Sequence, residues 1–128
     1  MTATARSARL PAALACLVAW AVPGAAHLWM GRRLKGLVFL AAITLMFGIG
    51  ILLEGRLFPF EFSQPLVALA ALAELGAGAP WGLARLAGLG AGRVAAVTYE
   101  YGNAFLIVAG LLNVLVTLDA YDIAKGRR

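Results

Sequence analysis

The feature that most constrains this chain is a series of apolar segments long enough to cross a lipid bilayer. Leu37–Leu53 contains no charged residue, and Leu10–Met30 is a second apolar run. A helix rises about 1.5 Å per residue, so roughly 20 apolar residues cover a hydrocarbon core about 30 Å thick. We therefore predict an all-α integral membrane protein.

The composition agrees with a membrane environment. Hydrophobic residues make up 62% of the 128 residues and charged residues only 13%, against about 25% charged residues in an average soluble domain. A soluble domain this small has too much surface to hide so many apolar side chains. We expect residues 1–128 to form a single membrane domain whose main partner is the lipid bilayer.

Three membrane spans are predicted, over residues 10–30, 37–53 and 103–124. Pro23-Gly24 interrupts the first one, and because proline removes a backbone donor, a kink is expected near Ala19–Pro23. Tyr99 and Tyr101 precede the last span and Tyr121 lies near its end, as aromatic residues do at membrane interfaces.

Residues 66–89 form a broken helical segment before the last span. The breaker at residues 76–80 divides this segment into two apolar halves of about ten residues, neither of which can cross a bilayer alone. We expect two short helices joined by a bend, either re-entrant or lying at the interface, and a single kinked span is the alternative. Glu74 and Arg85 are predicted to pair across the bend. The expected fold is a small bundle of three to four transmembrane helices.

The formal charge of +5 comes from basic residues that flank the apolar segments. Arg32, Arg33 and Lys35 precede the second span, and three more follow the last one. The positive-inside rule favours a cytoplasmic turn over residues 31–36, and a C-terminus on the same side favours three spans. Basic residues alternating with aromatic ones, which single-stranded nucleic acid requires, are missing, so no nucleic-acid partner is expected.

Asn113 is the clearest polar residue inside a predicted span. Gly110, Asn113 and Thr117 share one face of that helix because they are spaced by three and seven residues. An amide in hydrocarbon needs hydrogen-bond partners, which neighbouring helices supply. We interpret this face as a packing stripe against the first two spans, and a ligand or ion site is the alternative.

Asp119 and Asp122 lie near the end of the same helix, three residues apart. We expect interfacial ion pairs with the basic turn, although two carboxylates could also serve a cation or a proton relay. His27 is the only histidine and is expected to be structural, with a pH-dependent switch as the alternative. The candidate functional or helix-packing residues are His27, Arg32, Arg33, Lys35, Asn113, Thr117, Asp119 and Asp122.

Two stretches resemble known families. The first contains Pro23-Gly24, His27, Trp29, Gly31-Arg32-Arg33 and Lys35-Gly36, and it resembles the hairpin signature of TM2-domain-like membrane proteins. It departs from that signature in the spacing of His27 to Gly31, which is one residue shorter than usual. It also has Trp29 where an aromatic pair is expected.

The second stretch comprises residues 99–103, 109–113, 118–124 and 126–128, and it is similar to the end of an uncharacterised bacterial membrane-protein family, a domain of unknown function. This resemblance implies a multi-pass protein of the bacterial inner membrane and implies no activity.

The sequence contains no recognisable catalytic set, metal motif or cofactor motif. The leading hypothesis is therefore a non-enzymatic inner-membrane protein that acts as a structural or interaction subunit, associating with itself or with a larger membrane complex. A transporter-like or lipid-handling protein that uses the polar residues of the last span is the alternative.

Overall fold

The computed structural model describes residues 11–126, and these form an all-helical bundle without a β-strand. The helices are α2 (Ala12–Ala21), α3 (Ala25–Trp29), α4 (Arg33–Leu52), α5 (Pro65–Leu75), α6 (Ala79–Leu86) and α7 (Tyr99–Ala124). The extended loops that connect α4 to α5 and α6 to α7 meet in one isolated β-bridge between Arg56 and Ala91.

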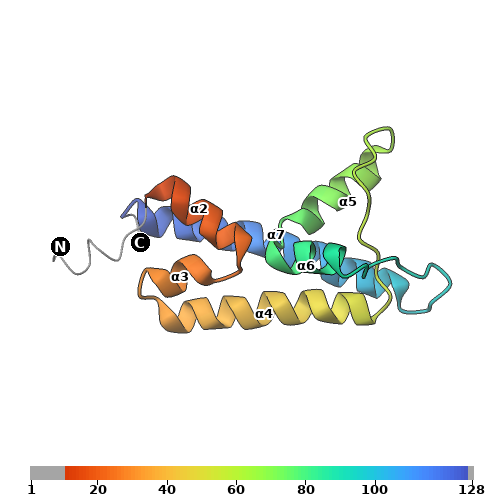
Figure 1. Ribbon diagram of the computed structural model, residues 1–128, viewed down its shortest axis with the longest axis horizontal. Coiled ribbons are helices and arrows are strands. Elements are labelled where there is room, and N and C mark those ends of the chain that lie inside the picture. Colours follow the sequence, from red (N-terminus) through yellow and green to blue (C-terminus); the bar gives the residue numbers. More distant parts are fainter. Residues whose placement is uncertain (1–10, 127–128) are drawn as a thin grey trace.

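Helices α4 and α7 form the long axis of the molecule. They lie side by side and antiparallel (Figure 1), with Lys35 near Asp119 at one end and Gly50 against Leu106 toward the other. Both are long and apolar enough to cross a membrane, and a third span results if α5 and α6 are taken together. The structure therefore supports two to three spans. The sequence allowed a fourth span, and none is seen in the described residues.

The first predicted span is divided into two short helices. Helix α2 ends at Ala21, and α3 begins at Ala25 after Pro23 and Gly24, within the region where a kink was expected. Gly24 has a φ of 80°, and an added Cβ there would overlap the backbone of Gly36 in α4. The chain therefore folds back along α4 after the break (Figure 1), and α2 and α3 together do not form one continuous helix across residues 10–30.

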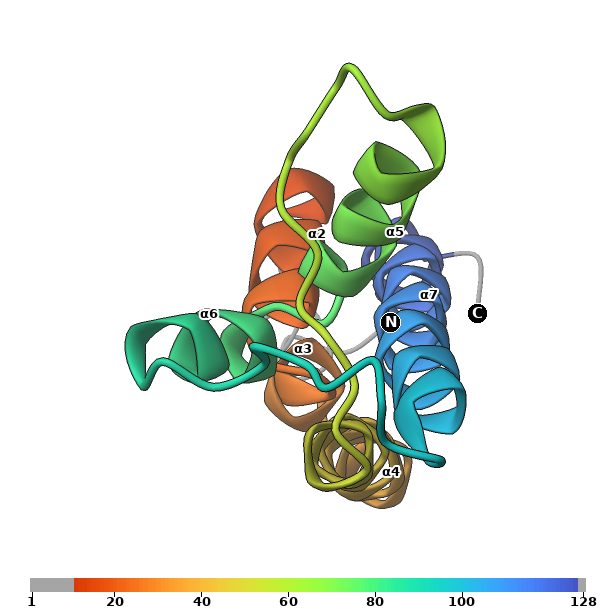
Figure 2. The same ribbon diagram turned by 90° about the vertical axis from the view of Figure 1, so that its right-hand side faces the viewer.

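The broken segment is a pair of short helices, which was the favoured prediction. Helices α5 and α6 are bent by 109° relative to each other at residues 76–78. Gly78 has a φ of 76°, and its Cα lies so close to the carbonyl of Trp20 that no side chain would fit. Viewed along the bundle, α5 and α6 diverge on two different sides of it (Figure 2).

Helix α4 begins earlier than the sequence pattern indicated. The predicted turn at residues 31–36 is shorter than expected, because Arg33 and Lys35 already belong to the first turn of α4. Helix α7 likewise begins at Tyr99 rather than Asn103. Both shifts follow from the hydropathy criterion, which marks the apolar part of a helix and not its polar ends.

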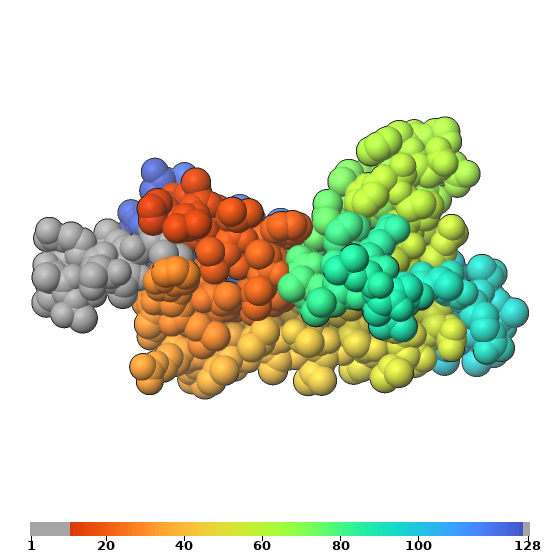
Figure 3. All heavy atoms as spheres, in the orientation of Figure 1, coloured from red at the N-terminus to blue at the C-terminus, as the bar shows by residue number. Residues whose placement is uncertain are grey.

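Two apolar clusters hold the bundle together. One lies between α4, α6 and α7 and includes Ile43, Phe47 and Leu106. The other joins α2 and α3 to the end of α7 through alanines such as Ala15, Ala19 and Ala120, whose small side chains let helix backbones approach closely. Helix α4 lies along the main body of the molecule, whereas α5 and the loop before it project from that body (Figure 3).

A candidate polar site at one end of an apolar groove

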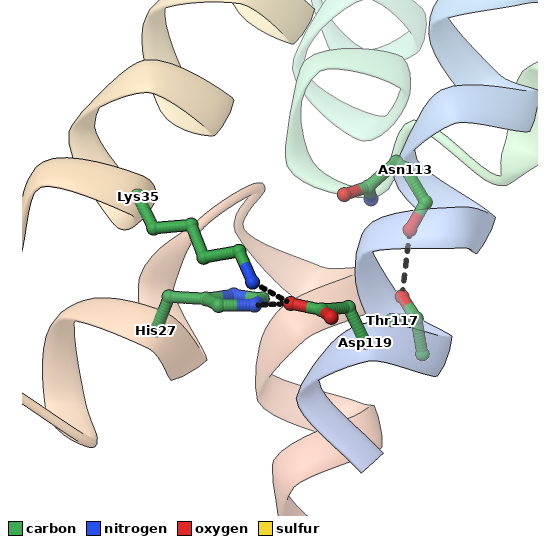
Figure 4. A network of polar contacts seen from close by, with 5 residues as sticks. All are labelled: His27, Lys35, Asn113, Thr117 and Asp119. Carbon is green, nitrogen blue, oxygen red and sulfur yellow. Dashed lines mark hydrogen bonds and ion pairs between the residues drawn. The ribbon is translucent and has the colours of Figure 1, made fainter. Parts of the chain in front are cut away.

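The candidate site is built on three side chains that come from three different helices. His27 from α3, Lys35 from α4 and Asp119 from α7 converge on one another (Figure 4). His27 Nε2 and Lys35 Nζ each lie 2.8 Å from the same carboxylate oxygen, Asp119 Oδ2. The carboxylate therefore links α7 to α3 and to the first turn of α4.

His27 is completely buried, whereas Asp119 is 13% and Lys35 34% exposed. Burial lowers the pKa of His27, and the neighbouring carboxylate of Asp119 only partly opposes this effect. The neutral ring then donates its Nε2 hydrogen to Asp119. His27 Nδ1 has no hydrogen-bond partner, which fits a neutral ring, since a protonated one would bury a second N–H donor without an acceptor.

The ring of Phe39 packs edge-on against His27, with the ring centres 5.0 Å apart. Phe39 thus separates the histidine from the apolar surface beyond it. The positive charges of Lys35 and Arg32 also disfavour protonation of His27, so the site combines one carboxylate with several cations at the start of α4.

An apolar groove of about 540 Å³ extends from this polar cluster along the seam between α4 and α7. Lys35 and Asp119 line its polar end. The remaining lining residues are apolar: Val38, Phe39, Ala42, Ile43, Leu112, Leu115 and Val116. The volume lies within the range of about 300–1,000 Å³ typical of small-molecule sites. Because Val38 and Leu115 are more than half exposed, the groove is open on the side that would face lipid.

Asn113 belongs to a second polar cluster, which lies deeper in the bundle. Its Nδ2 donates hydrogen bonds to the carbonyl of Trp20 at 3.0 Å and to that of Gly76 at 2.8 Å. The indole of Trp20 in turn donates to the carbonyl of Leu75. The Asn113 side chain is fully buried, so it joins the end of α2 and the bend after α5 to the middle of α7.

The predicted packing stripe on α7 is present, and only one of its two partners differs from those expected. Gly110 faces α5, because an added Cβ would overlap the carbonyl of Ala73. Thr117 is half-buried and donates to the carbonyl of Asn113 within its own helix (Figure 4). The stripe packs against α2, which belongs to the first predicted span, and against α5 in place of the second predicted span, and it is covered within the chain.

The other predicted residues lie around the first cluster. Arg32 and Arg33 are exposed at the start of α4, and Asp122 is half-buried on the turn of α7 that follows Asp119. Among residues 11–126 no group of three or more His, Cys, Asp and Glu side chains is placed to hold a metal ion. The cation alternative for Asp119 and Asp122 therefore gains no third ligand there.

The expected direct pair of Glu74 and Arg85 is replaced by an indirect link. Glu74 Oε1 accepts a hydrogen bond from the backbone N–H of Phe58, and Arg85 Nη2 donates to the carbonyl oxygen of the same residue, both at 2.8 Å. The two side chains thus hold the backbone of one loop residue, Phe58, between them. Trp20 was not singled out by the sequence pattern, and only its position before the Pro23 break hinted at its role.

Comparison with known proteins identifies the family of this chain. Residues 14–128 match the family of unknown function DUF6677. The protein belongs to this family. The DUF6677 match covers every helix that forms the two clusters except the first residues of α2. No curated protein and no solved structure matches the chain. The family description names no activity. The groove and the polar clusters are therefore the features from which a function can be inferred.

Proposed function

We propose that this protein is a non-enzymatic protein of the bacterial inner membrane that binds a phospholipid in the groove between α4 and α7. The observation that carries the proposal is the division of the groove into a charged end, formed by the Lys35–Asp119 ion pair, and an apolar body. Lipids have the matching structure, because a charged headgroup is joined to an apolar chain. This proposal develops the lipid-handling alternative that the sequence left open.

Lys35 is the residue that selects the headgroup. An ammonium group has several N–H donors, and Asp119 Oδ2 accepts only one hydrogen bond from it in this structure. The other donors remain available to a phosphate oxygen. Arg32 and Arg33 add positive charge at the same end of α4, and the start of a helix itself carries partial positive charge. An anionic phospholipid such as phosphatidylglycerol therefore fits better than a zwitterionic one.

The groove offers one acyl chain a surface built from two helices. Ile43 and Val116 form its buried floor, while Val38, Leu112 and Leu115 form more exposed walls. Ala42 is small and exposed, and it leaves the space in which the chain would lie. A transporter-like role is less well supported, because Asn113 is bonded to two backbone carbonyls and does not line this groove.

The test compares Ala42→Phe with Ala41→Phe. Both residues are exposed on α4, but only Ala42 lines the groove. Native mass spectrometry of protein purified in a mild detergent should detect one phospholipid retained per chain in the wild type and in Ala41→Phe. The Ala42→Phe variant should lose it. Equal retention in the two variants would exclude the groove as the binding site.

Headgroup selection is tested with Lys35→Gln and its control Arg33→Gln, which removes the same charge at the same end of α4 without touching the groove. Loss of the Lys35 charge should weaken binding of phosphatidylglycerol relative to phosphatidylcholine by about 1 kcal/mol, or roughly fivefold. A dimer that Ala42→Phe abolishes would show instead that a second copy of the chain fills the groove, and it would support the interaction-subunit hypothesis.

A further inference from the structure

A second pocket lies at the opposite end of the bundle, beyond the end of α4. It has a volume of about 330 Å³ and is lined by Arg56, Leu57, Pro59, Arg85 and residues 88–91. Two arginines therefore share one small pocket, and no Asp or Glu residue contributes to its described lining. We propose that this pocket is a binding site for a phosphate group, distinct from the lipid groove and independent of it.

The position of Arg56 is fixed by its backbone. Its N–H donates to Asn103 Oδ1 of α7 at 2.7 Å, and the next residue, Leu57, donates to the carbonyl of Gly90 at 2.8 Å. Arg56 also forms the isolated β-bridge with Ala91. The two loops are thus held against each other and against α7, which makes the pocket a defined feature of the fold.

Glycines in the loop between α6 and α7 make room for the side chain of Arg56. Gly92 has a φ of 76°, and a Cβ at this position would overlap the side chain of Arg56. Gly90 lies just as close to the side chain of Leu57. Residues 88–92 do not have the sequence of a P-loop, because no strand precedes them and no Gly-Lys-Ser/Thr follows. In the structure this glycine-rich segment forms a wall against which the two arginines lie.

Aromatic rings orient both guanidinium groups. Arg56 lies over the ring of Phe58, with its Cζ 5.5 Å from the ring centre, and Arg85 lies over Trp81 at 5.3 Å. Stacking on a ring leaves the N–H donors at the edge of the guanidinium plane available. In the described residues the only protein acceptor bonded to these side chains is the carbonyl of Phe58, which accepts from Arg85 Nη2.

The charge balance of the pocket favours an anion. Glu74 is the carboxylate whose charge reaches both arginines, but it is buried, and its Oε1 is already bonded to the backbone of Phe58. No carboxylate contributes to the described lining of the pocket itself. The two arginines therefore repel each other there, and a phosphate removes this repulsion while accepting hydrogen bonds from both. Planar guanidinium groups match phosphate geometry better than ammonium groups do.

Two sources can supply such a group, a soluble phosphate compound or the headgroup of a phospholipid at this end of the bundle. Both have the phosphate oxygens that the arginines require. Isothermal titration of inorganic phosphate into the full-length protein, in an uncharged detergent and at constant ionic strength, tests the soluble source. Titration with a short-chain phosphatidylglycerol, with phosphatidylcholine as reference, tests the headgroup. The lipid titration uses the Ala42→Phe variant, so that the groove does not contribute.

The decisive variant is Arg56→Gln, because the Arg56 side chain makes no hydrogen bond within the described structure and its loss should not unfold the protein. Binding of the phosphate probe should weaken about tenfold, the effect of losing one charge-assisted contact. Arg93→Gln is the matched control, since Arg93 lies in the loop between α6 and α7 that faces Arg56 but does not line the pocket. Its affinity should match that of the wild type.

Arg85→Gln provides the second variant and should weaken binding to a similar extent. The proposal is overturned if neither probe binds the wild type, or if Arg93→Gln loses as much affinity as Arg56→Gln. Binding of inorganic phosphate identifies a soluble ligand, and binding of phosphatidylglycerol alone identifies a lipid headgroup. Loss of lipid from the groove has no bearing on this result, so the two proposals fail separately.

Discussion

Asn113 donates a hydrogen bond of 3.0 Å to the main-chain oxygen of Trp20, a residue 93 positions earlier in the chain. The same amide also donates to the carbonyl of Gly76. Two chain breaks, one after α2 and one after α5, therefore converge on a single side chain near the middle of α7. Helix ends leave carbonyl groups without partners, and Asn113 supplies the donors that these two ends lack.

Replacing Asn113 by Leu should destabilise the protein by about 1–3 kcal/mol, since two interhelical hydrogen bonds are lost and two buried carbonyls remain without donors. The midpoint of thermal unfolding in detergent measures the effect. Thr117→Val is the control, because Thr117 bonds only within α7, and it should change stability by less than about 1 kcal/mol. Similar losses in both variants would contradict the bridging role of Asn113.

Gly110→Ala should also destabilise the protein, by about 1–3 kcal/mol, because the added methyl group forces α5 away from α7. Gly48→Ala tests the same substitution on α4 at a position with open space around it. There the higher helix propensity of alanine should leave stability unchanged or raise it. Unfolding midpoints of the two variants should therefore move apart, and a shift of both in the same direction would argue against close packing of α5.

Acidification should destabilise the protein through His27. Its pKa is lowered by burial in the folded state, so the unfolded chain binds the proton more readily. This contribution to stability is complete above the unfolded pKa of about 6.5 and is lost as the pH falls toward the lower folded pKa. Unfolding midpoints measured between pH 7.5 and pH 5.5 should decrease accordingly.

His27→Gln provides the control for this pH effect. A glutamine amide can still donate to Asp119 but does not titrate, so the variant should lose most of the dependence in this range. An unchanged pH profile in His27→Gln would assign the dependence to another group.

The arrangement of the two chain breaks predicts which positions are reached from each side of the membrane. Single cysteines at Ser63 and Thr98, in a Cys16→Ala background, should label from one side, and a cysteine at Lys125 from the other. A cysteine at Pro11 should label with Lys125, since α2 runs only from the end of α7 to Asn113 and then turns back. If residues 10–30 crossed the membrane, Pro11 would label with Ser63 instead.

The helical membrane fold could be predicted from the sequence because hydropathy and helix length depend on local composition. The Pro23-Gly24 and 76–80 breaks were visible for the same reason. Whether the chain is kinked or reverses its direction at each break could not be predicted, because a kink and a reversal have the same local sequence. Only the packing of Gly24 against Gly36 and of Gly78 against Trp20 distinguishes a reversal from a bent span.

The candidate site was predicted in part. An ion pair between the basic turn and the last helix was expected, and Lys35 with Asp119 confirms it. That His27 shares the same carboxylate oxygen could not be predicted, because it depends on the reversal after α2. Asn113 was recognised from its polarity, but its partners are backbone carbonyls, which every residue carries and no sequence pattern marks. The groove depends on which faces of α4 and α7 meet.

Helix α7 packs against α2, α4 and α5 and is the last of the described helices to leave the ribosome. The ends of α2 and α5 therefore have no donor for their carbonyls until Asn113 has been synthesised and has entered the bilayer. The packing of the earlier described helices is thus completed only when α7 joins them.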